Sequence, residues 1–327
     1  MVTQDSLLVT LVKLVDRLPQ PVSPVKRGRG HPQVYSNQLF LKAVVIMIIR
    51  HLRTVHELLG VLAEPTPEMC QLRELLCEQG GFPTRRTWER RLKSLPETLP
   101  AQIGCLGRYL IERISPWQKR GRAVAIDSTV LRSRGAVWHQ KHRKTGEVPH
   151  TLIDTEAHWT KSGWHGWVYG WKLHVVSVVA GVWFPVAALL TPANVADNTP
   201  APALLREVPA DVRFVLGDRH YNTPEIREDC ALSGRTLVAT QLGSYPHTDD
   251  GVEVRRVFHK LRSIAMENFN QHFKSIFDGH GQVPTKGLIA TQRFVLGAIF
   301  VYQLALLYRW EQGLDLCVGL KAFLKGA

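Results

Sequence analysis

Apolar positions recur at helical spacing through the first third of the chain. A first helix is expected at the N-terminus, and the proline- and glycine-containing segment 19–32 ends it. From Ser36 or Asn37, either of which can cap a helix, apolar residues return every three or four positions. The pattern predicts an N-terminal helix and basic linker over residues 1–35, followed by a helical module over residues 36–120.

The pattern changes beyond residue 120, where apolar runs of strand length begin. These predicted strands cover residues 122–130, 171–181, 182–190, 214–218 and 235–240. Helices are predicted after the third strand, after the fourth and after the fifth, at residues 201–208, 223–234, 258–277 and 286–310.

Three successive strands followed by strand–helix alternation match the mixed sheet of a ribonuclease H-like fold. The sequence therefore predicts an α/β fold, with a five-stranded mixed sheet flanked by helices over residues 121–311 and an all-α module before it. Residues 312–327 are expected to form a C-terminal tail.

Charge is distributed unevenly between these two parts. The chain has 41 Lys+Arg against 28 Asp+Glu, a net charge of +13, and its first 122 residues hold 19 of the basic and 10 of the acidic side chains. A basic module beside a nearly balanced one suggests that the first binds a polyanion and the second has another role. The alternative is a basic surface that only confers solubility.

One predicted helix concentrates this charge. In FPTRRTWERRLKSLP, residues 82–96, Thr84 can cap a helix whose buried face is formed by Trp88, Leu92 and Leu95. The candidate phosphate contacts on this helix are Arg85, Arg86, Arg90 and Arg91. It is predicted to be a DNA-binding helix, such as the second helix of a helix-turn-helix; the alternative is a solvated basic helix.

The composition favours a cytoplasmic protein. The five cysteines form no CxxC pair, which argues against a thiolate zinc site and a disulfide framework. The N-terminus lacks the features of a signal peptide. Neither of the most apolar runs, 39–49 and 294–308, reaches the ~20 residues needed to span a bilayer, so both are predicted to be core helices and no membrane partner is expected.

Three carboxylates form the candidate catalytic site. Asp127 and Asp218 each end an apolar strand, and in the predicted topology these strands are parallel neighbours. Glu267 lies in the helix after the fifth strand. Each acid by itself is more often a turn former or a cap, so the prediction depends on their joint placement.

Three carboxylates at roughly 6 Å would repel one another by about 3 kcal/mol per pair, so a cation is needed. Oxygen ligands favour Mg²⁺ or Mn²⁺ over zinc. The sequence predicts that Asp127, Asp218 and Glu267 bind two Mg²⁺ ions, which Mn²⁺ could replace, for in-line phosphoryl transfer.

Four segments resemble motifs of the DDE transposases of bacterial insertion sequences. AIDSTVLRS is similar to the first-Asp motif, GWVYGWKLHVV with LLTPANVADNTPAPALL to the second and third strands, VLGDRHYNTPEIREDCALSG to the second-Asp motif, and RSIAMENFNQHFKSIF to the Glu helix. The similarity covers most of the chain. It implies metal-dependent cutting at the ends of a mobile element and strand transfer into target DNA. The implied enzyme acts on double-stranded DNA as a homodimer or larger synaptic complex, at the nucleoid in the bacterial cytoplasm.

The resemblance also implies DNA contacts near the acids, by Tyr221, Arg262 and Lys274. Lys274 stands seven residues after Glu267, as the family pattern requires. Arg262 stands five residues before Glu267, where the pattern has an Arg four before; Ser263 holds that place here.

Residues 132–171 interleave cationic and aromatic side chains, which suits binding of a nucleic-acid strand. The predicted phosphate contacts are Arg132, Arg134, Lys141 and Arg143, and the predicted stacking residues are Trp138, Trp159 or Trp164. Five histidines in this region offer zinc as an alternative, but their spacing is irregular. Lys172 and His174 alternate onto one face of the next strand and are further predicted DNA contacts.

Three functions remain open on this evidence. The first is an active transposase, which all three acids favour. The second is a catalytically inactive, transposase-derived DNA-binding protein, which the shifted Arg262 favours. The third is a general metal-dependent nuclease that ignores end sequences.

Overall fold

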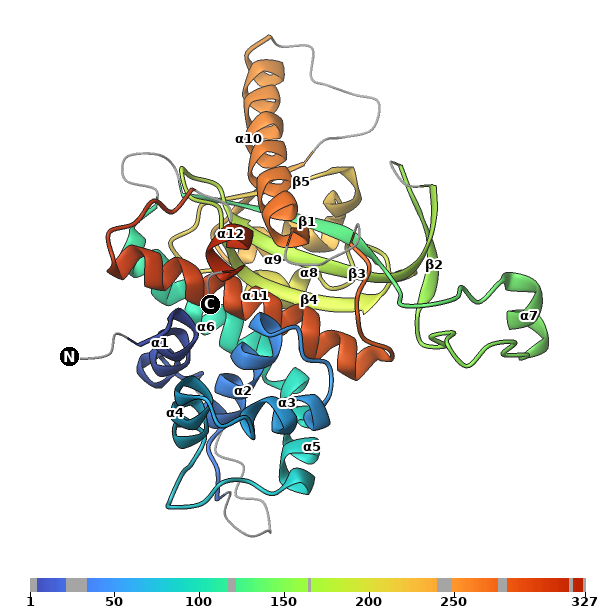
Figure 1. The fold of residues 1–327 in the computed structure, drawn as a ribbon. Coiled ribbons are helices and arrows are strands. Elements are labelled where there is room, and N and C mark those ends of the chain that lie inside the picture. The colour runs from blue at the N-terminus through green and yellow to red at the C-terminus, as the bar shows by residue number, and fades with distance from the viewer. Residues whose placement is uncertain are drawn as a thin grey trace.

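The computed structural model describes residues 5–21, 34–116, 122–163, 166–239, 249–275, 281–317 and 320–325. Most of the predicted basic linker, Trp164 and His165 lie outside the described residues. A group of N-terminal helices packs beneath a twisted mixed sheet that carries helices on both faces (Figure 1).

The N-terminal helices begin where the sequence places capping residues. They are α1 (Leu7–Leu14), η1 (Val15–Arg17), α2 (Asn37–Ile49), α3 (Val55–Leu62), α4 (Pro67–Leu75), α5 (Arg85–Ser94), η2 (Leu95–Glu97) and α6 (Leu99–Ile114). The hydroxyls of Ser36, Thr54 and Thr84 each accept a hydrogen bond from a backbone N–H in the first turn of the helix that follows. The predicted helical module is thus present as a set of short capped helices.

The described residues form one sheet of six strands. They are β1 (Ala123–Arg132), β2 (His158–Ser162), β3 (Gly166–Val178), β4 (Pro185–Pro192), β5 (Phe214–Gly217) and β6 (Thr236–Ala239). The strands run in the order β2-β3-β1-β5-β6, and β4 pairs with β3. Strand β3 is antiparallel to β1, β2 and β4, whereas β1, β5 and β6 are parallel to one another. With β2 set aside, the order β4-β3-β1-β5-β6 is the ribonuclease H-like arrangement.

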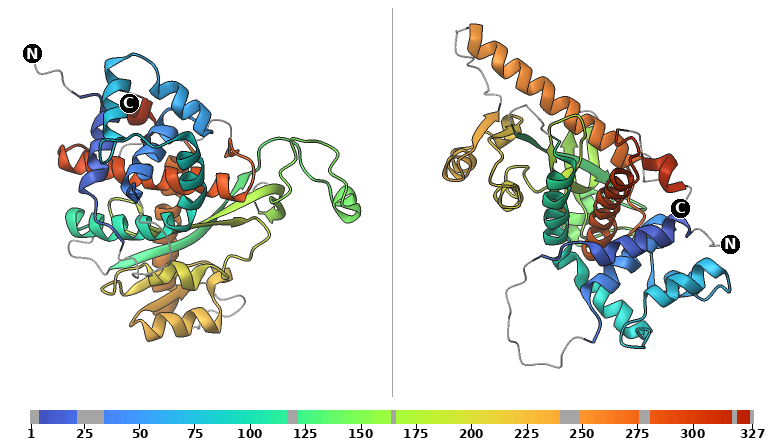
Figure 2. Two further views of the ribbon diagram at one scale, coloured as in Figure 1. Left: turned by 90° about the horizontal axis from the view of Figure 1, so that it is seen from below. Right: turned by 90° about the vertical axis from the view of Figure 1, so that its left-hand side faces the viewer.

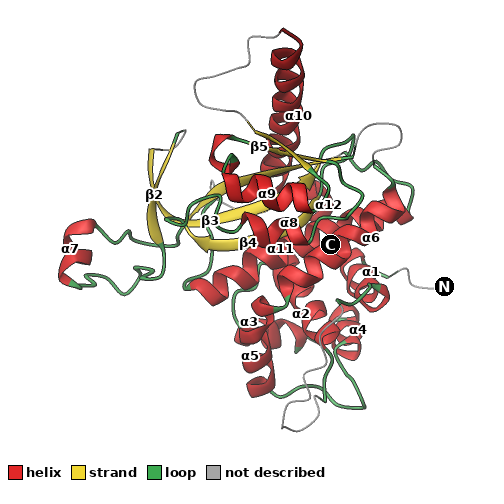
Figure 3. Cartoon of the chain, turned by 180° about the vertical axis from the view of Figure 1, so that it is seen from behind, coloured by secondary structure: helices red, strands yellow, loops and turns green. Residues whose placement is uncertain are grey.

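The remaining helices cover the sheet. They are α7 (Gln140–Thr145), α8 (Ala201–Arg206), η3 (Arg219–Tyr221), α9 (Pro224–Leu232), α10 (Asp249–Lys274), α11 (Leu288–Glu311) and α12 (Leu320–Lys325). Helices α6 and α11 lie on one face and α8 and α9 on the other, while α10 extends beyond the sheet (Figure 2). The view from behind shows that the segment containing α7 projects well away from the sheet (Figure 3).

Helix α11 joins the two parts of the chain. It packs against α2, α6 and β4, and the buried Gln303 amide donates hydrogen bonds to the backbone oxygens of Ile103 (3.0 Å) and Pro185 (2.7 Å). By length and composition α11 could cross a membrane, but 72% of its most apolar stretch is buried inside the protein. The prediction of a core helix here is confirmed.

Several elements of the structure differ from the sequence predictions. The prediction of a five-stranded sheet was wrong by one strand, because His158–Ser162, which lies outside the predicted strands, pairs with the N-terminal part of β3. The helix predicted over residues 258–277 begins earlier, at Asp249, and α10 ends at Lys274. The expected tail contains α12. The short polar β2 has little apolar alternation, and only its pairing with a long neighbouring strand makes it a strand.

Candidate active site

Asp127 and Asp218 occupy equivalent places on adjacent strands. Ala125 of β1 pairs with Leu216 of β5 in parallel register, and each aspartate follows two residues later. Buried apolar residues hold β1 and β5 in the middle of the sheet, so the two carboxylates lie side by side. The prediction that Asp127 ends its strand was wrong, because β1 continues to Arg132 in its pairing with β3, whereas Asp218 directly follows the last residue of β5. The pairing of β1 with β5 confirms the predicted adjacency of the two strands.

Burial and neighbouring charges act on the Asp127 carboxyl. Its side chain is 24% exposed, and burial raises its pKa to about 6. Arg262 and the Ser128 N–H oppose this rise, whereas the carboxylates of Asp218 and Asp197 add to it. The Arg262 Nη1 lies 3.2 Å from Asp127 Oδ2, and the Ser128 N–H donates to Asp127 Oδ1 at 2.8 Å. A positive charge at this point therefore favours the ionised carboxylate.

Asp218 begins η3 as well as ending β5. Its Oδ1 accepts a hydrogen bond of 2.8 Å from the backbone N–H of His220, so it caps the short helix, as an isolated aspartate in this context commonly does. This bond engages one carboxylate oxygen and fixes the side chain. The other oxygen has no hydrogen bond to a described residue and can bind a ligand.

Asp197 is a third acid close to this pair, in the loop between β4 and α8. Its Oδ1 accepts hydrogen bonds from Ser128 Oγ (2.8 Å) and forms an ion pair with Lys172 Nζ (2.9 Å). Burial opposes its ionisation, but the hydrogen bonds from Lys172 and Ser128 outweigh burial and lower its pKa. Asp197 is not among the site residues predicted from the sequence, although it contacts the residue beside Asp127. The available signal was the strand lysine, which needs an anionic partner when it is buried.

The predicted DNA contacts of β3 lie beneath the surface. Lys172 Nζ also donates to the Val195 oxygen at 2.9 Å. His174 is fully buried, its Nε2 lies 2.9 Å from Thr191 Oγ1, and burial lowers its pKa to about 4, so it is neutral at pH 7. Lys172 supports the loop that carries Asp197, whereas His174 contacts Thr191 of β4. A direct contact of either side chain with DNA stays a prediction.

Tyr221 lies within the same electrostatic environment. Its side chain is 1% exposed, and its hydroxyl has no hydrogen-bond partner among the described residues. Burial raises its pKa well above the ordinary value, and the carboxylates of Asp127, Asp197 and Asp218 raise it further. This buried hydroxyl beside three acids is thus a polar group that a water or a bound ligand would satisfy.

Helix α10 presents Arg262, and not Glu267, to Asp127. Ala265, Met266, Phe269 and Phe273 form its buried face, whereas the neighbouring Ile264 is exposed. Glu267 is exposed, and five residues of helix place it about 140° around the axis from Arg262. The described residues contain no group of three or more acidic, histidine or cysteine side chains that could hold a metal.

Lys274 interacts electrostatically with the Asp127 carboxylate. Burial lowers the pKa of Lys274, and the Asp127 carboxylate opposes that change. The structure thus brings together Asp127, Asp218, Tyr221, Arg262 and Lys274. Among the described contacts Glu267 does not join them.

The basic helix α5 is built as predicted. Trp88, Leu92 and Leu95 are buried. Arg85 forms an ion pair with Glu89 (2.8 Å), and Arg91 donates to Asn37 Oδ1 (2.6 Å). Arg86 and Arg90 are exposed and have no hydrogen bond or ion pair to another described residue, which leaves both available to phosphates.

Comparison with known proteins places the sheet region in a family. The model of a family described as "Transposase DDE domain" matches residues 118–304. No curated protein matches the chain. Among solved structures, the cryo-EM structure of the piggyBac transposase synaptic complex with hairpin DNA is similar over 97% of this chain and 76% of that chain, with 9% sequence identity and a TM-score of 0.43.

Proposed function

The chain belongs to the transposase DDE domain family, and from this premise we propose that it cuts DNA at the ends of its mobile element and joins them to target DNA. Its partners in this proposal are double-stranded DNA, comprising terminal inverted repeats and target, and a second copy of the chain in a synaptic complex. The proposed location is the bacterial nucleoid.

The observation that carries this proposal is the placement of Asp127 and Asp218 on neighbouring parallel strands, each two residues beyond the matched pair Ala125 and Leu216. The oxygen donors of the two aspartates suit Mg²⁺, with Mn²⁺ as a substitute. The Asp218 and Asp197 carboxylates add to the rise in the pKa of Asp127, and this repulsion supports a cation beside the two aspartates. When bound, two metal ions would activate a water or a 3′-hydroxyl and stabilise the leaving oxygen.

The chain's own residues orient the site in this proposal. The Ser128 N–H fixes Asp127, and the Ser128 hydroxyl ties the same strand to Asp197 and hence to Lys172. Arg262 neutralises Asp127 in the structure described. Glu267, the proposed third ligand, joins the two aspartates if α10 turns or shifts on the sheet, and Arg262 is then released towards the DNA phosphates.

The position of Glu267 also favours a second candidate, an inactive DNA-binding protein derived from a transposase. The exposed glutamate and the Arg262–Asp127 ion pair describe a site that is not assembled for three-carboxylate metal binding. The two candidates differ in whether the protein cleaves DNA when Mg²⁺ is added.

Purified protein with Mg²⁺ is expected to nick DNA that carries the inverted repeats bracketing its gene, because the two aspartates supply the metal ligands. Nicking is measured on end-labelled duplexes by denaturing gel. EDTA should abolish it, and duplexes with scrambled ends should be cut far more slowly. Binding without cleavage under any metal would support the inactive protein, and equal cutting of scrambled ends would indicate a general nuclease.

Replacing Arg86 and Arg90 of α5 together by Gln is expected to weaken DNA binding and to lower the slope of log Kd against log salt concentration by about 2, because each phosphate contact contributes about 0.9. Fluorescence anisotropy over a KCl series in EDTA measures this slope. Arg206→Gln, on the exposed surface of α8, is the matched control. A double variant with the wild-type slope would show that α5 does not contact phosphates.

A further inference from the structure

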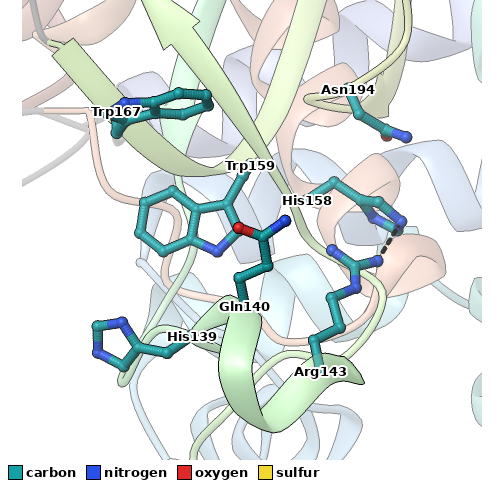
Figure 4. Close-up of a pocket in the computed structure, with 7 residues that line it drawn as sticks. All are labelled: His139, Gln140, Arg143, His158, Trp159, Trp167 and Asn194. Carbon is teal, nitrogen blue, oxygen red and sulfur yellow. Dashed lines mark hydrogen bonds between the residues drawn. The ribbon is translucent and has the colours of Figure 1, made fainter. Parts of the chain in front are cut away.

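A pocket of about 650 Å³ lies between α7 and the β2–β3 hairpin, away from the paired aspartates. Figure 4 shows the side chains that surround it. Its described lining residues include no acid; they are His139, Gln140, Arg143, His158, Trp159, Trp167 and Asn194. Its volume falls within the roughly 300–1,000 Å³ of small-molecule sites.

Two tryptophans give the pocket flat aromatic walls. Trp159 is held in place, since its indole N–H donates to the Trp138 oxygen at 2.8 Å and its ring lies 5.3 Å from that of Tyr169. Trp167 lies two residues before Tyr169 on β3, hence on the same face of the hairpin. Its side chain is 67% exposed. A large indole left open to solvent beside a fixed one is suited to receive a planar ligand.

The pocket is also cationic. Arg143 of α7 projects into it, where its guanidinium hydrogen-bonds with His158 Nε2 (Figure 4) and lies 5.4 Å from the centroid of the Trp138 ring. Lys161 is exposed and stands directly opposite Trp167 on β2, so the two side chains share a face. Aromatic walls with positive charge at the rim match a base and its phosphate.

We propose that this pocket binds an unpaired nucleotide of the DNA substrate, with the base stacked on Trp167 and Trp159 and the phosphate near Arg143. The proposal rests on the proposed function only in taking DNA as the substrate. The base must be unpaired, because in a duplex both of its faces are covered by neighbouring bases and an indole cannot reach them.

The position of the pocket fits a strand that passes the paired aspartates. Asp127 lies opposite Val175 on β3, eight residues along this strand from Trp167. At ~3.3 Å per residue this is roughly 26 Å. A stacked DNA strand covers the same length in about eight nucleotides at ~3.4 Å each. The loop after β4 connects the two places, since it carries both Asn194 of the pocket and Asp197.

The test compares Trp167→Ala with wild type on two probes in EDTA: labelled dT12 and a blunt 12-base-pair duplex. Loss of one stacking contact should weaken dT12 binding by about 5-fold or more, while binding to the duplex changes less than about 2-fold. Arg143→Gln should lower the salt dependence on dT12 by about 0.7. Fluorescence anisotropy gives both constants. Trp310→Ala, which removes an indole 37% exposed at the end of α11, should bind both probes as wild type does.

Trp167→Phe retains an aromatic face and should restore most of the dT12 affinity. Equal weakening on both probes would overturn the proposal in favour of a general phosphate contact. Unchanged dT12 binding by Trp167→Ala, or no dT12 binding by wild type, would overturn the proposal. Either result would indicate that the pocket does not bind an unpaired base. Because EDTA prevents metal-dependent cleavage, this result is independent of whether the enzyme cuts.

Discussion

Asp218→Asn and Glu267→Gln are each expected to reduce Mg²⁺-dependent strand cleavage by more than about 1,000-fold, above the ~100- to 1,000-fold cost of removing one preorganised donor from a transition state. Each substitution replaces a proposed metal ligand with a neutral amide of the same shape. Single-turnover cleavage of the element-end duplex measures the rate. Asn at position 218 can still accept the His220 N–H, and Glu267 is exposed, so neither change should unfold the protein.

Asp229→Asn on α9 is the matched control for Asp218→Asn and should cut at the wild-type rate, because Asp229 lies on the helix after η3 and not at the strand end. Both variants should bind DNA in EDTA as wild type does. Wild-type cleavage by Asp218→Asn would exclude the proposed mechanism. Loss with Asp218→Asn alone would keep the aspartate pair and assign the third ligand to a residue other than Glu267.

Gly170→Ala is expected to lower the free energy of unfolding by more than about 3 kcal/mol. This is a large effect for one substitution, and a steric clash with backbone atoms accounts for it. A Cβ at this position would lie 2.0 Å from the Leu131 oxygen and 2.8 Å from the Ser133 nitrogen. Both are backbone atoms of the chain leaving β1, so they cannot turn away as a side chain would. Gly170 also pairs with both Arg132 and His158, so β3 has a neighbouring strand on each side at this residue. Urea unfolding followed by circular dichroism measures the change.

Gly60→Ala is the control for that substitution. Gly60 lies in α3 with nothing within 4 Å of an added Cβ, so Ala there should stabilise the protein by about 0.5–1 kcal/mol. A Gly170→Ala protein as stable as wild type would show that β1 and β3 can separate at this point without cost. The pairing of β3 with β1 and β2 would then hold the pocket and the aspartates in a less rigid relative position than the strand register indicates.

The local signals in the sequence were sufficient for much of this protein. Hydroxyl caps at Ser36 and Thr84 and the buried face of α5 formed as predicted, because each depends on residues three or four positions apart. The order of strands and helices also predicted that β1 and β5 are neighbours. Handedness and connection rules leave few ways to arrange such a chain. The adjacency of Asp127 and Asp218 followed from that order.

The sequence by itself determined the capped helices, the parallel pair of strands and the equivalent positions of the two aspartates on that pair. Only the tertiary structure decided that His158–Ser162 is a strand, that Asp197 holds Ser128 across 69 residues of chain, and that Arg262 takes the place beside Asp127. It also decided that Trp159 and Trp167 share one pocket. These features depend on register between distant strands and on the rotation of α10 about its axis. Neither is encoded in the spacing of nearby residues, because both are set by how the whole core packs.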